Sequence, residues 1–154
     1  MKYAAFIRGV GPENPNMHQE KLVWFFESLG FTNVYGIISS GNVVFETDKK
    51  GDVALEKFIE ENLPLKLGFS RAVIIRSQNE LQNLVNSDPF KGVKDSPTSK
   101  LNVTFLKKGG EIFTIINPDI KGTTKVMYEL EKQYGKDITT RTLGTIEKIL
   151  RKME

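Results

Sequence analysis

The sequence predicts an α+β protein built from two tandem βαββα (ferredoxin-like) subdomains and a C-terminal helix. Two observations lead to this prediction. Up to Ser77, apolar runs typical of strands and apolar repeats typical of helices follow one another in the order β-α-β-β-α-β, the split βαβ pattern. The same order then begins again from the strand around Ile74. We therefore expect a ferredoxin-like subdomain over residues 1–77 and a second α+β subdomain, packed on the first, over residues 78–154.

The first subdomain opens with the continuous apolar run 3–7, which is typical of a strand buried on both faces. Residues 22–29 carry apolar side chains at the spacing of one helical face. Residues 34–45 form two apolar arms around a Ser-Ser-Gly-Asn turn and predict a β-hairpin. A second helix over 55–63 stops near a proline, and the strand 72–75 completes the unit. Because both faces of these strands are apolar, we expect the second half to cover the face that the helices leave open.

The second subdomain opens with a capping box, Ser77 followed by Glu80, which starts a helix that must end before the next proline. Residues 101–116 then predict a second hairpin around a Lys-Gly-Gly turn. A helix is expected over 123–134, ended by a glycine. Apolar residues over 143–153 indicate the final helix.

Composition excludes several classes of site. The 154 residues contain no cysteine, which removes disulfides, thiolate metal sites and cysteine nucleophiles. His18 is the only histidine, so histidine-based triads are excluded and zinc or iron sites are not expected. We predict no metal and no cofactor. The N-terminus reads as a strand and not as a signal peptide, and no apolar run approaches ~18 residues. We therefore expect a cytoplasmic protein without a membrane segment.

Charge is unevenly distributed along the chain, although the net charge is only +3. Residues 1–90 hold 9 Lys/Arg and 11 Asp/Glu, a net of −2, whereas residues 91–154 hold 13 and 8, a net of +5. A basic second half favours anionic partners such as nucleic acid. The lysines are interleaved with acids, however, which is also typical of an ordinary solvated surface.

One candidate site follows from the predicted topology. In a split βαβ unit the first strand ends beside the turn of the central hairpin and near the start of the first helix. Helix starts and arginine side chains both favour anions. The alternative is that the turn residues only make the turn and that the arginine braces the loop. The residues expected to converge in a small anion or phosphate site are Arg8, Gly9, Ser39, Ser40, Gly41 and Asn42.

A second candidate lies just ahead of the last helix, at Thr139-Thr140-Arg141. The threonines are compatible with helix caps. Alternatively, Thr140 and Arg141 extend the same anion site. The two interpretations differ in whether the arginine faces a ligand or the protein.

These stretches together resemble the Domain of Unknown Function 1697 family. That family has Arg-Gly-Ile-Asn-Val-Gly-Gly after its first strand, Ser-Gly-Asn-Val-Val-Phe in the hairpin and Thr-Thr-Arg-Asn-Trp-Asn-Thr near the end. This chain has Arg8-Gly9, the complete hairpin motif over 40–45 and Thr-Thr-Arg over 139–141. It departs from the pattern at 10–14 and at 142–145. The resemblance implies a two-part α+β fold with ferredoxin-like halves and no established activity.

The leading hypothesis is a cytoplasmic protein that binds a small anionic or nucleotide-like ligand. The alternatives are a nucleic-acid-binding protein that uses the basic second half, and an enzyme of unknown class. An enzyme would depend on Ser, Thr, Lys, Tyr or carboxylate chemistry, because no nucleophile–base pair can be identified in the sequence. A purely structural or oligomerising role is a fourth possibility, and the sequence does not indicate the oligomeric state.

Overall fold

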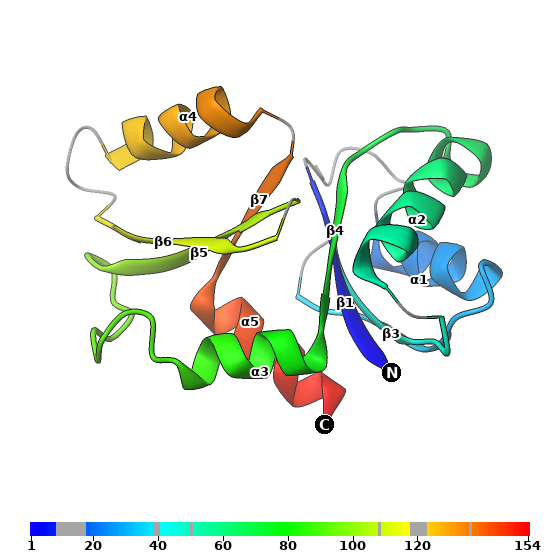
Figure 1. The fold of residues 1–154 in the computed structure, drawn as a ribbon, viewed down its shortest axis with the longest axis horizontal. Helices are drawn as coiled ribbons and strands as arrows, with labels where there is room; N and C mark the ends of the chain where they lie inside the picture. The colour runs from blue at the N-terminus through cyan, green and yellow to red at the C-terminus, as the bar shows by residue number, and fades with distance from the viewer. Residues whose placement is uncertain (9–17, 39–40, 50, 108, 118–122, 136) are drawn as a thin grey trace.

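The computed structural model describes residues 1–8, 18–38, 41–49, 51–107, 109–117, 123–135 and 137–154. It is an α+β structure with two antiparallel sheets and five helices in the described ranges (Figure 1). None of these helices is long and apolar enough to cross a bilayer. In chain order the elements are β1 (Lys2–Ile7), α1 (Gln19–Ser28), β2 (Thr32–Gly36), β3 (Asn42–Glu46), α2 (Asp52–Leu67), β4 (Val73–Ser77), α3 (Gln78–Asn86), β5 (Lys100–Leu106), β6 (Glu111–Ile116), α4 (Thr123–Tyr134), β7 (Ile138–Thr142) and α5 (Leu143–Met153).

The first sheet has the strand order β2-β3-β1-β4, and every neighbouring pair is antiparallel. Helices α1 and α2 both lie on one face of this sheet (Figure 1). Their apolar stripes pack against alternate residues of the strands, because successive side chains of a strand point to opposite faces. The strand residues in this first core are Tyr3, Ala5, Ile7, Val43, Phe45, Val73 and Ile75.

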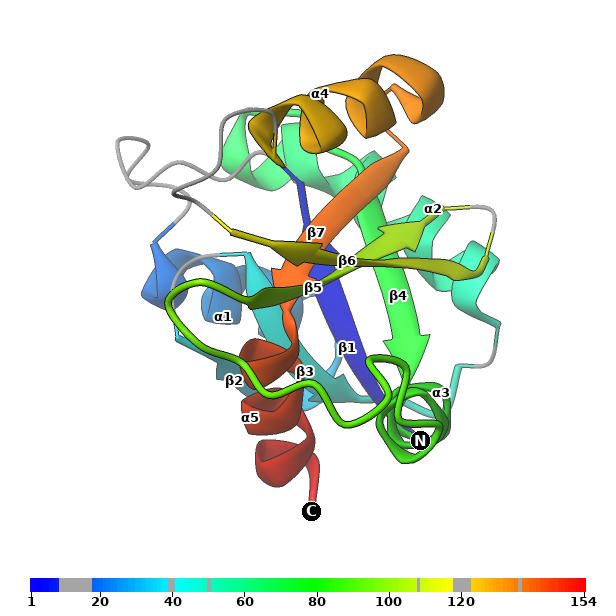
Figure 2. The ribbon, with the colours of Figure 1, turned by 90° about the vertical axis from the view of Figure 1, so that its left-hand side faces the viewer.

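The second sheet has the order β6-β5-β7 and is also antiparallel. Helix α4 lies on one side of it, whereas α3 and α5 lie on the other (Figure 1, Figure 2). A second core fills the space between the two sheets and these two helices. It contains Ala4, Phe6, Val44 and Ile74 from the first sheet, Leu101, Val103 and Phe105 from the second, and Ile146, Ile149 and Leu150 from α5. The second half thus covers the face of the first sheet that α1 and α2 leave open, as expected.

The second half is not a repeat of the first. Strand β4 belongs to the first sheet, and β7 pairs directly with β5. We expected residues 139–141 to precede the last helix without forming a strand, but they lie within β7. The β-branched residues of 138–142 suit a strand, and the pairing partner that decides the matter is far away in sequence. The cap of α5 is Thr142, whose Oγ1 accepts from the Thr145 N–H at 3.2 Å.

Helix α2 also runs further than expected, continuing through Pro64 to Leu67. A proline inside a helix removes one backbone hydrogen bond. Here Leu63 and Leu67 are both buried, so packing of the last turn against the first sheet offsets that loss. Gly68, with φ 77°, then ends the helix in the left-handed conformation that glycine adopts readily.

Candidate functional site

The end of β1 and the turn before β3 lie side by side, as the topological argument predicts. The Ile7 N–H donates to the Gly41 carbonyl at 2.9 Å, and Phe6 lies opposite Asn42 in the pairing of β1 with β3. Arg8 follows directly and is therefore at the same end of the sheet. The other members of the expected site lie outside the described residues: Gly9, Ser39 and Ser40.

Arg141 reaches this end of the first sheet from β7, but protein acceptors enclose its guanidinium. Burial lowers the pKa of Arg141 to about 10, which leaves it charged at neutral pH. A guanidinium has five N–H groups, so these acceptors match its full donor capacity. They are Asn42 Oδ1 at 2.5 Å from Nε, Thr139 Oγ1 and the Thr140 carbonyl at 2.7 and 2.9 Å from Nη1, and the Ile7 and Gly41 carbonyls at 3.1 and 3.2 Å from Nη2.

Arg8 points in the opposite direction, from the first sheet toward the second half. Its Nη1 donates to the carbonyls of Gly135 and Ile138 at 2.7 and 3.1 Å. Its Nη2 lies 3.5 Å from a carboxylate oxygen of Glu131, and the Arg8 side chain is 23% exposed. The bracing role that we gave as the alternative for Arg8 matches these contacts, although the partners lie on α4, just after it and on β7, and not in the neighbouring loop.

Thr140, the remaining member of the expected set, shares a hydrogen bond with the Thr104 hydroxyl at 2.8 Å. That bond lies within the second sheet, whereas the contacts of the other described members join the two sheets at one end of the first. These other members are Arg8, Gly41, Asn42 and Arg141.

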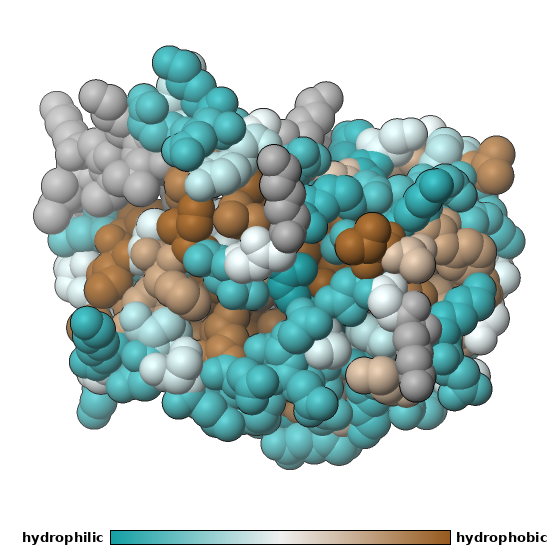
Figure 3. Space-filling view, viewed as in Figure 1, coloured by the Kyte–Doolittle hydropathy of each residue, from teal (hydrophilic) through white to brown (hydrophobic). Residues whose placement is uncertain are grey.

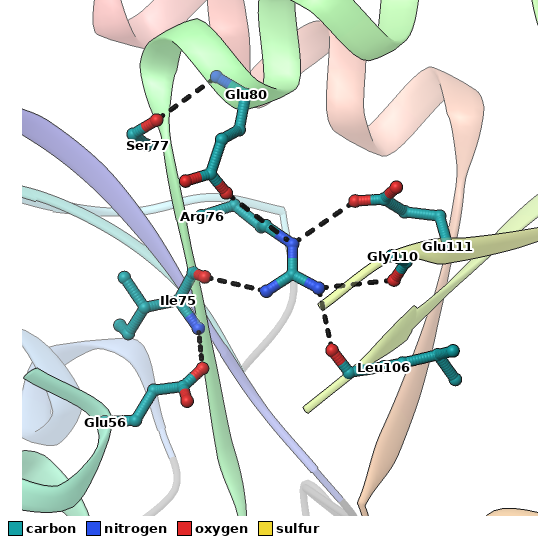
Figure 4. Close-up of polar contacts among 8 residues, drawn as sticks. All are labelled: Glu56, Ile75, Arg76, Ser77, Glu80, Leu106, Gly110 and Glu111. Carbon is teal, nitrogen blue, oxygen red and sulfur yellow. Dashed lines mark hydrogen bonds and ion pairs between the residues drawn. The ribbon is translucent and has the colours of Figure 1, made fainter. Parts of the chain in front are cut away.

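Arg76 of β4 makes a matching connection from the first sheet to the second. It is only 4% exposed, and its guanidinium reaches the turn between β5 and β6 (Figure 4). Sequence reasoning missed this residue, although an arginine at the end of an apolar strand was an available signal. Its acceptors are the Ile75 carbonyl at 2.9 Å from Nη1, the Leu106 and Gly110 carbonyls at 2.8 and 3.3 Å from Nη2, and carboxylates of Glu111 and Glu80 at 3.3 and 3.8 Å from Nε.

Side chains also bind the outer backbone edge of β4. The N–H groups of Val73 and Ile75 donate to Glu60 and Glu56 at 3.4 and 2.8 Å, and Lys107 donates to the Val73 carbonyl at 3.0 Å. The Lys107 ammonium also lies 2.7 Å from Glu60 and 3.8 Å from Glu56. Burial raises the pKa of Glu56, whereas the Ile75 N–H and Lys107 act in the opposite direction. The three charged side chains cover this sheet edge, and the Lys107 ammonium offsets part of the negative charge of the two carboxylates.

A cleft of about 700 Å³ lies where α2, α3 and the β5–β6 hairpin meet. Its walls come from both halves of the chain. Apolar side chains line part of it, including Val53, Leu84 and Phe113. The charged side chains that line it are Asp52, Glu56, Glu80 and Glu111, with Arg76 and Lys107 as the cations.

Glu80 stands at the start of α3, where its N–H donates to Ser77 Oγ at 3.1 Å and confirms this part of the predicted capping box. Burial, followed by a hydrogen bond with Asp52 and the charge of Asp52, raises the pKa of Glu80 from 4.5 to about 7. Arg76 and Ser77 oppose this rise. The Glu80 side chain is 44% exposed, so its proton can exchange with solvent. This group can therefore give or take a proton, or bind a cation, near neutral pH.

A smaller hollow of about 360 Å³ lies between β2, β3 and the end of α5. Lys2 donates to the Met153 carbonyl at 2.5 Å there, and the Lys152 ammonium sits 4.1 Å from the centroid of the Tyr35 ring. Both cations thus have protein partners. In the ranges that the structure describes, no group of three or more His, Cys, Asp or Glu side chains is placed to hold a metal ion.

Comparison with known proteins identifies a family and solved structures with a similar fold. The family described as "Protein of unknown function (DUF1697)" matches residues 1–134. The structure of the conserved bacterial protein SP0830 from Streptococcus pneumoniae is similar to this one over 99% of this chain and 98% of that chain, with a TM-score of 0.74 and 19% sequence identity. At that identity the likeness concerns the fold alone. No curated protein matches the sequence.

Proposed function

This chain belongs to the DUF1697 family of proteins of unknown function, and we propose that it binds a small molecule with a basic nitrogen group in the cleft. The observation that carries the proposal is which charged groups of the cleft already have partners in the protein. Both cations are held by protein acceptors, whereas the carboxyl groups of Asp52 and Glu80 lie close together, and their interaction helps to raise the pKa of Glu80 to about 7. A cationic group favours the ionised form of such a carboxyl group.

The cations of the cleft have little capacity left for an anionic ligand. Lys107 has contacts with two carboxylates and one carbonyl, which match the three N–H groups of an ammonium. Arg76 is bound to three carbonyls and lies beside two carboxylates. A phosphate entering the cleft would meet more carboxylates than unused donors, so repulsion opposes it.

The carboxylates supply the attraction for a cation. Glu80 and Glu111 approach Arg76 from two sides, and Asp52 lies against Glu80 from α2. A ligand amine would bind where Asp52 and Glu80 meet and favour the ionised form of Glu80. The apolar side chains in the wall, among them Leu84 and Phe113, offer contact to a short carbon chain. Linear amines have this combination of charge and apolar length.

The test is a thermal shift series at low ionic strength with putrescine, spermidine, arginine, ATP and inorganic phosphate. We expect the amines to raise the melting temperature and the anions to leave it unchanged. Glu80→Gln should abolish the rise. Glu147→Gln, an exposed carboxylate on α5, is the matched control and should retain it. An equal rise in wild type and Glu80→Gln, or none with any amine, would refute the proposal.

A second candidate is a small anionic or nucleotide-like ligand at the end of β1. The observation in its favour is that Arg8, Asn42 and Arg141 gather there, with Arg8 partly exposed. Stabilisation by ATP or phosphate that is lost in Arg8→Gln would support it. The residues proposed for this site are Arg8, Gly9, Ser39, Ser40, Gly41, Asn42, Thr140 and Arg141.

Both candidates assume a cytoplasmic protein of two subdomains, residues 1–77 on the ferredoxin-like plan and residues 78–154 packed on it. The cleft belongs to neither subdomain alone, because Asp52 and Arg76 come from the first, whereas Glu80 and Glu111 come from the second. Ligand binding would therefore depend on the contact between them.

A further inference from the structure

The outer edge of β6 has backbone groups directed away from its sheet. The Leu106 N–H donates to the Gly110 carbonyl at 3.0 Å, which makes this the first hydrogen-bonded pair of the β5–β6 hairpin. In an antiparallel pair, hydrogen-bonded and non-hydrogen-bonded positions alternate. With the observed register, the N–H and C=O groups of Glu111, Phe113 and Ile115 therefore point outward.

Two of the other three sheet edges, β4 and β7, carry side chains on their outward backbone groups. The edge of β4 is bound by Glu56, Glu60, Lys107 and Arg76, as described above. On β7, arginines donate to the carbonyls of Ile138 and Thr140. Just after β2, Gln19 Nε2 donates to the Ile38 carbonyl at 2.8 Å. In the part of the chain that the structure describes, no side chain is hydrogen-bonded to the outward backbone groups of β6, whereas natural proteins usually protect their edges.

The side chains of β6 also suit pairing with another strand. Phe113 and Ile115 are 38% and 49% exposed. Figure 3 shows apolar surface over β6 on the face toward the viewer. The strand sequence Glu-Ile-Phe-Thr-Ile-Ile has a single charge, Glu111, whose carboxylate is held by Arg76 at 3.3 Å. Two copies of this strand can therefore approach each other without unpaired like charges.

We propose that β6 pairs antiparallel with β6 of a second copy of this chain, which joins two three-stranded sheets into one sheet across a twofold axis. The outward groups alternate at Glu111, Phe113 and Ile115, so an axis at Phe113 makes the pattern self-complementary. Phe113 then faces the second copy's Phe113, an aromatic cross-strand pair. The second copy also borders the cleft, because Glu111 and Phe113 line it.

The test is the molar mass of the full chain by light scattering and sedimentation over micromolar to millimolar concentration. Wild type should rise from 17.4 kDa toward twice that mass as concentration increases. Ile115→Lys, at an exposed position, should stay monomeric. Leu65→Lys, which replaces an 81% exposed leucine on α2, is the control and should dimerise as wild type does.

A second variant separates backbone pairing from apolar contact. Ile115→Pro removes an outward N–H and leaves the hydrogen bonds to β5 in place, so it should also prevent the dimer while thermal unfolding remains cooperative. A wild type that is monomeric at every concentration would overturn the proposal. So would a dimer that survives Ile115→Lys and Ile115→Pro. This proposal does not depend on amine binding, and either can fail without the other.

Discussion

Phe6 of β1 and Phe105 of β5 stack face to face between the two sheets, with ring centroids 4.6 Å apart and an interplanar angle of 14°. Each ring of this pair also lies near the guanidinium of an arginine. The Cζ of Arg141 lies 5.6 Å from the Phe6 centroid, and the Cζ of Arg76 lies 5.4 Å from the Phe105 centroid. Each arginine comes from the sheet opposite to the ring that it covers, so the four side chains link both halves of the protein.

Replacing Arg141 by lysine should destabilise the fold, because an ammonium cannot reach the five acceptors that the guanidinium fork reaches. Each buried carbonyl left without a donor costs about 1–3 kcal/mol. Urea unfolding should show a loss of at least that size. Arg151→Lys, on the exposed side of α5, should stay within about 0.5 kcal/mol of wild type. Equal stabilities for the two variants would show that Arg141 does not join the sheets.

The stacked rings should be energetically coupled. We predict a coupling energy of about 0.5–1.5 kcal/mol from a double-mutant cycle of Phe6→Leu and Phe105→Leu. The single variants lose the same ring contact, so the second change should cost less once the first is made. Additive losses in chemical unfolding would mean that the rings contribute only through burial.

Stability should depend on pH through Glu80. Its pKa in the folded protein is about 7, above its ordinary value of 4.5, so the folded state binds more protons than the unfolded state between these values. The free energy of unfolding should therefore be largest below about pH 4.5 for this group and fall as pH rises through about 7. Glu56, whose pKa is also raised, acts in the same direction.

The contribution of Glu80 is isolated by comparing wild type with Glu80→Gln, in which Glu56 is unchanged. The difference in unfolding free energy between the two proteins should change with pH in that window and be constant above it. The Glu80 side chain is 44% exposed, so solvent screening reduces the effect. A difference that is independent of pH would contradict the raised pKa.

Affinity for spermidine should also depend on pH, with the opposite trend to stability. The amine stays protonated across neutral pH, whereas Glu80 loses its proton near pH 7. Affinity by titration calorimetry should increase about three- to fivefold from about pH 6 to about pH 8, equivalent to about 0.6–1 kcal/mol. Glu80→Gln should bind weakly with no pH dependence, and an affinity that falls as pH rises would contradict the proposed binding mode.

The sequence predicted the first half of the fold well because its signals are local. The apolar runs of β1 and β4, the hairpin turn before β3 and the capping box at Ser77 each depend on residues close together in the chain. Strand β7 was missed because its pairing with β5 is set by residues about 36 positions away, as in the Thr104–Thr140 pair. No local pattern distinguishes a short polar strand from a capping segment.

The candidate site was predicted only in part, for a related reason. Topology placed Arg8 and Asn42 at the same end of the sheet, but the direction of Arg141 depends on the carbonyls that surround it. Likewise, Asp52 and Glu80 belong to different helices, and no spacing in the sequence indicates that their carboxyl groups meet. Contacts between the two halves of the chain determine both the direction of Arg141 and the approach of Asp52 to Glu80.

Amide chemical shifts during a spermidine titration test the central claim most directly, because they locate the binding site. We predict that the changes cluster around the cleft, at Glu80, Asn83, Gly109 and Gly110, and saturate with increasing amine. Changes that centre on Arg8, Gly41 and Asn42, or that are absent at Glu80, would contradict the assignment of the cleft as the ligand site.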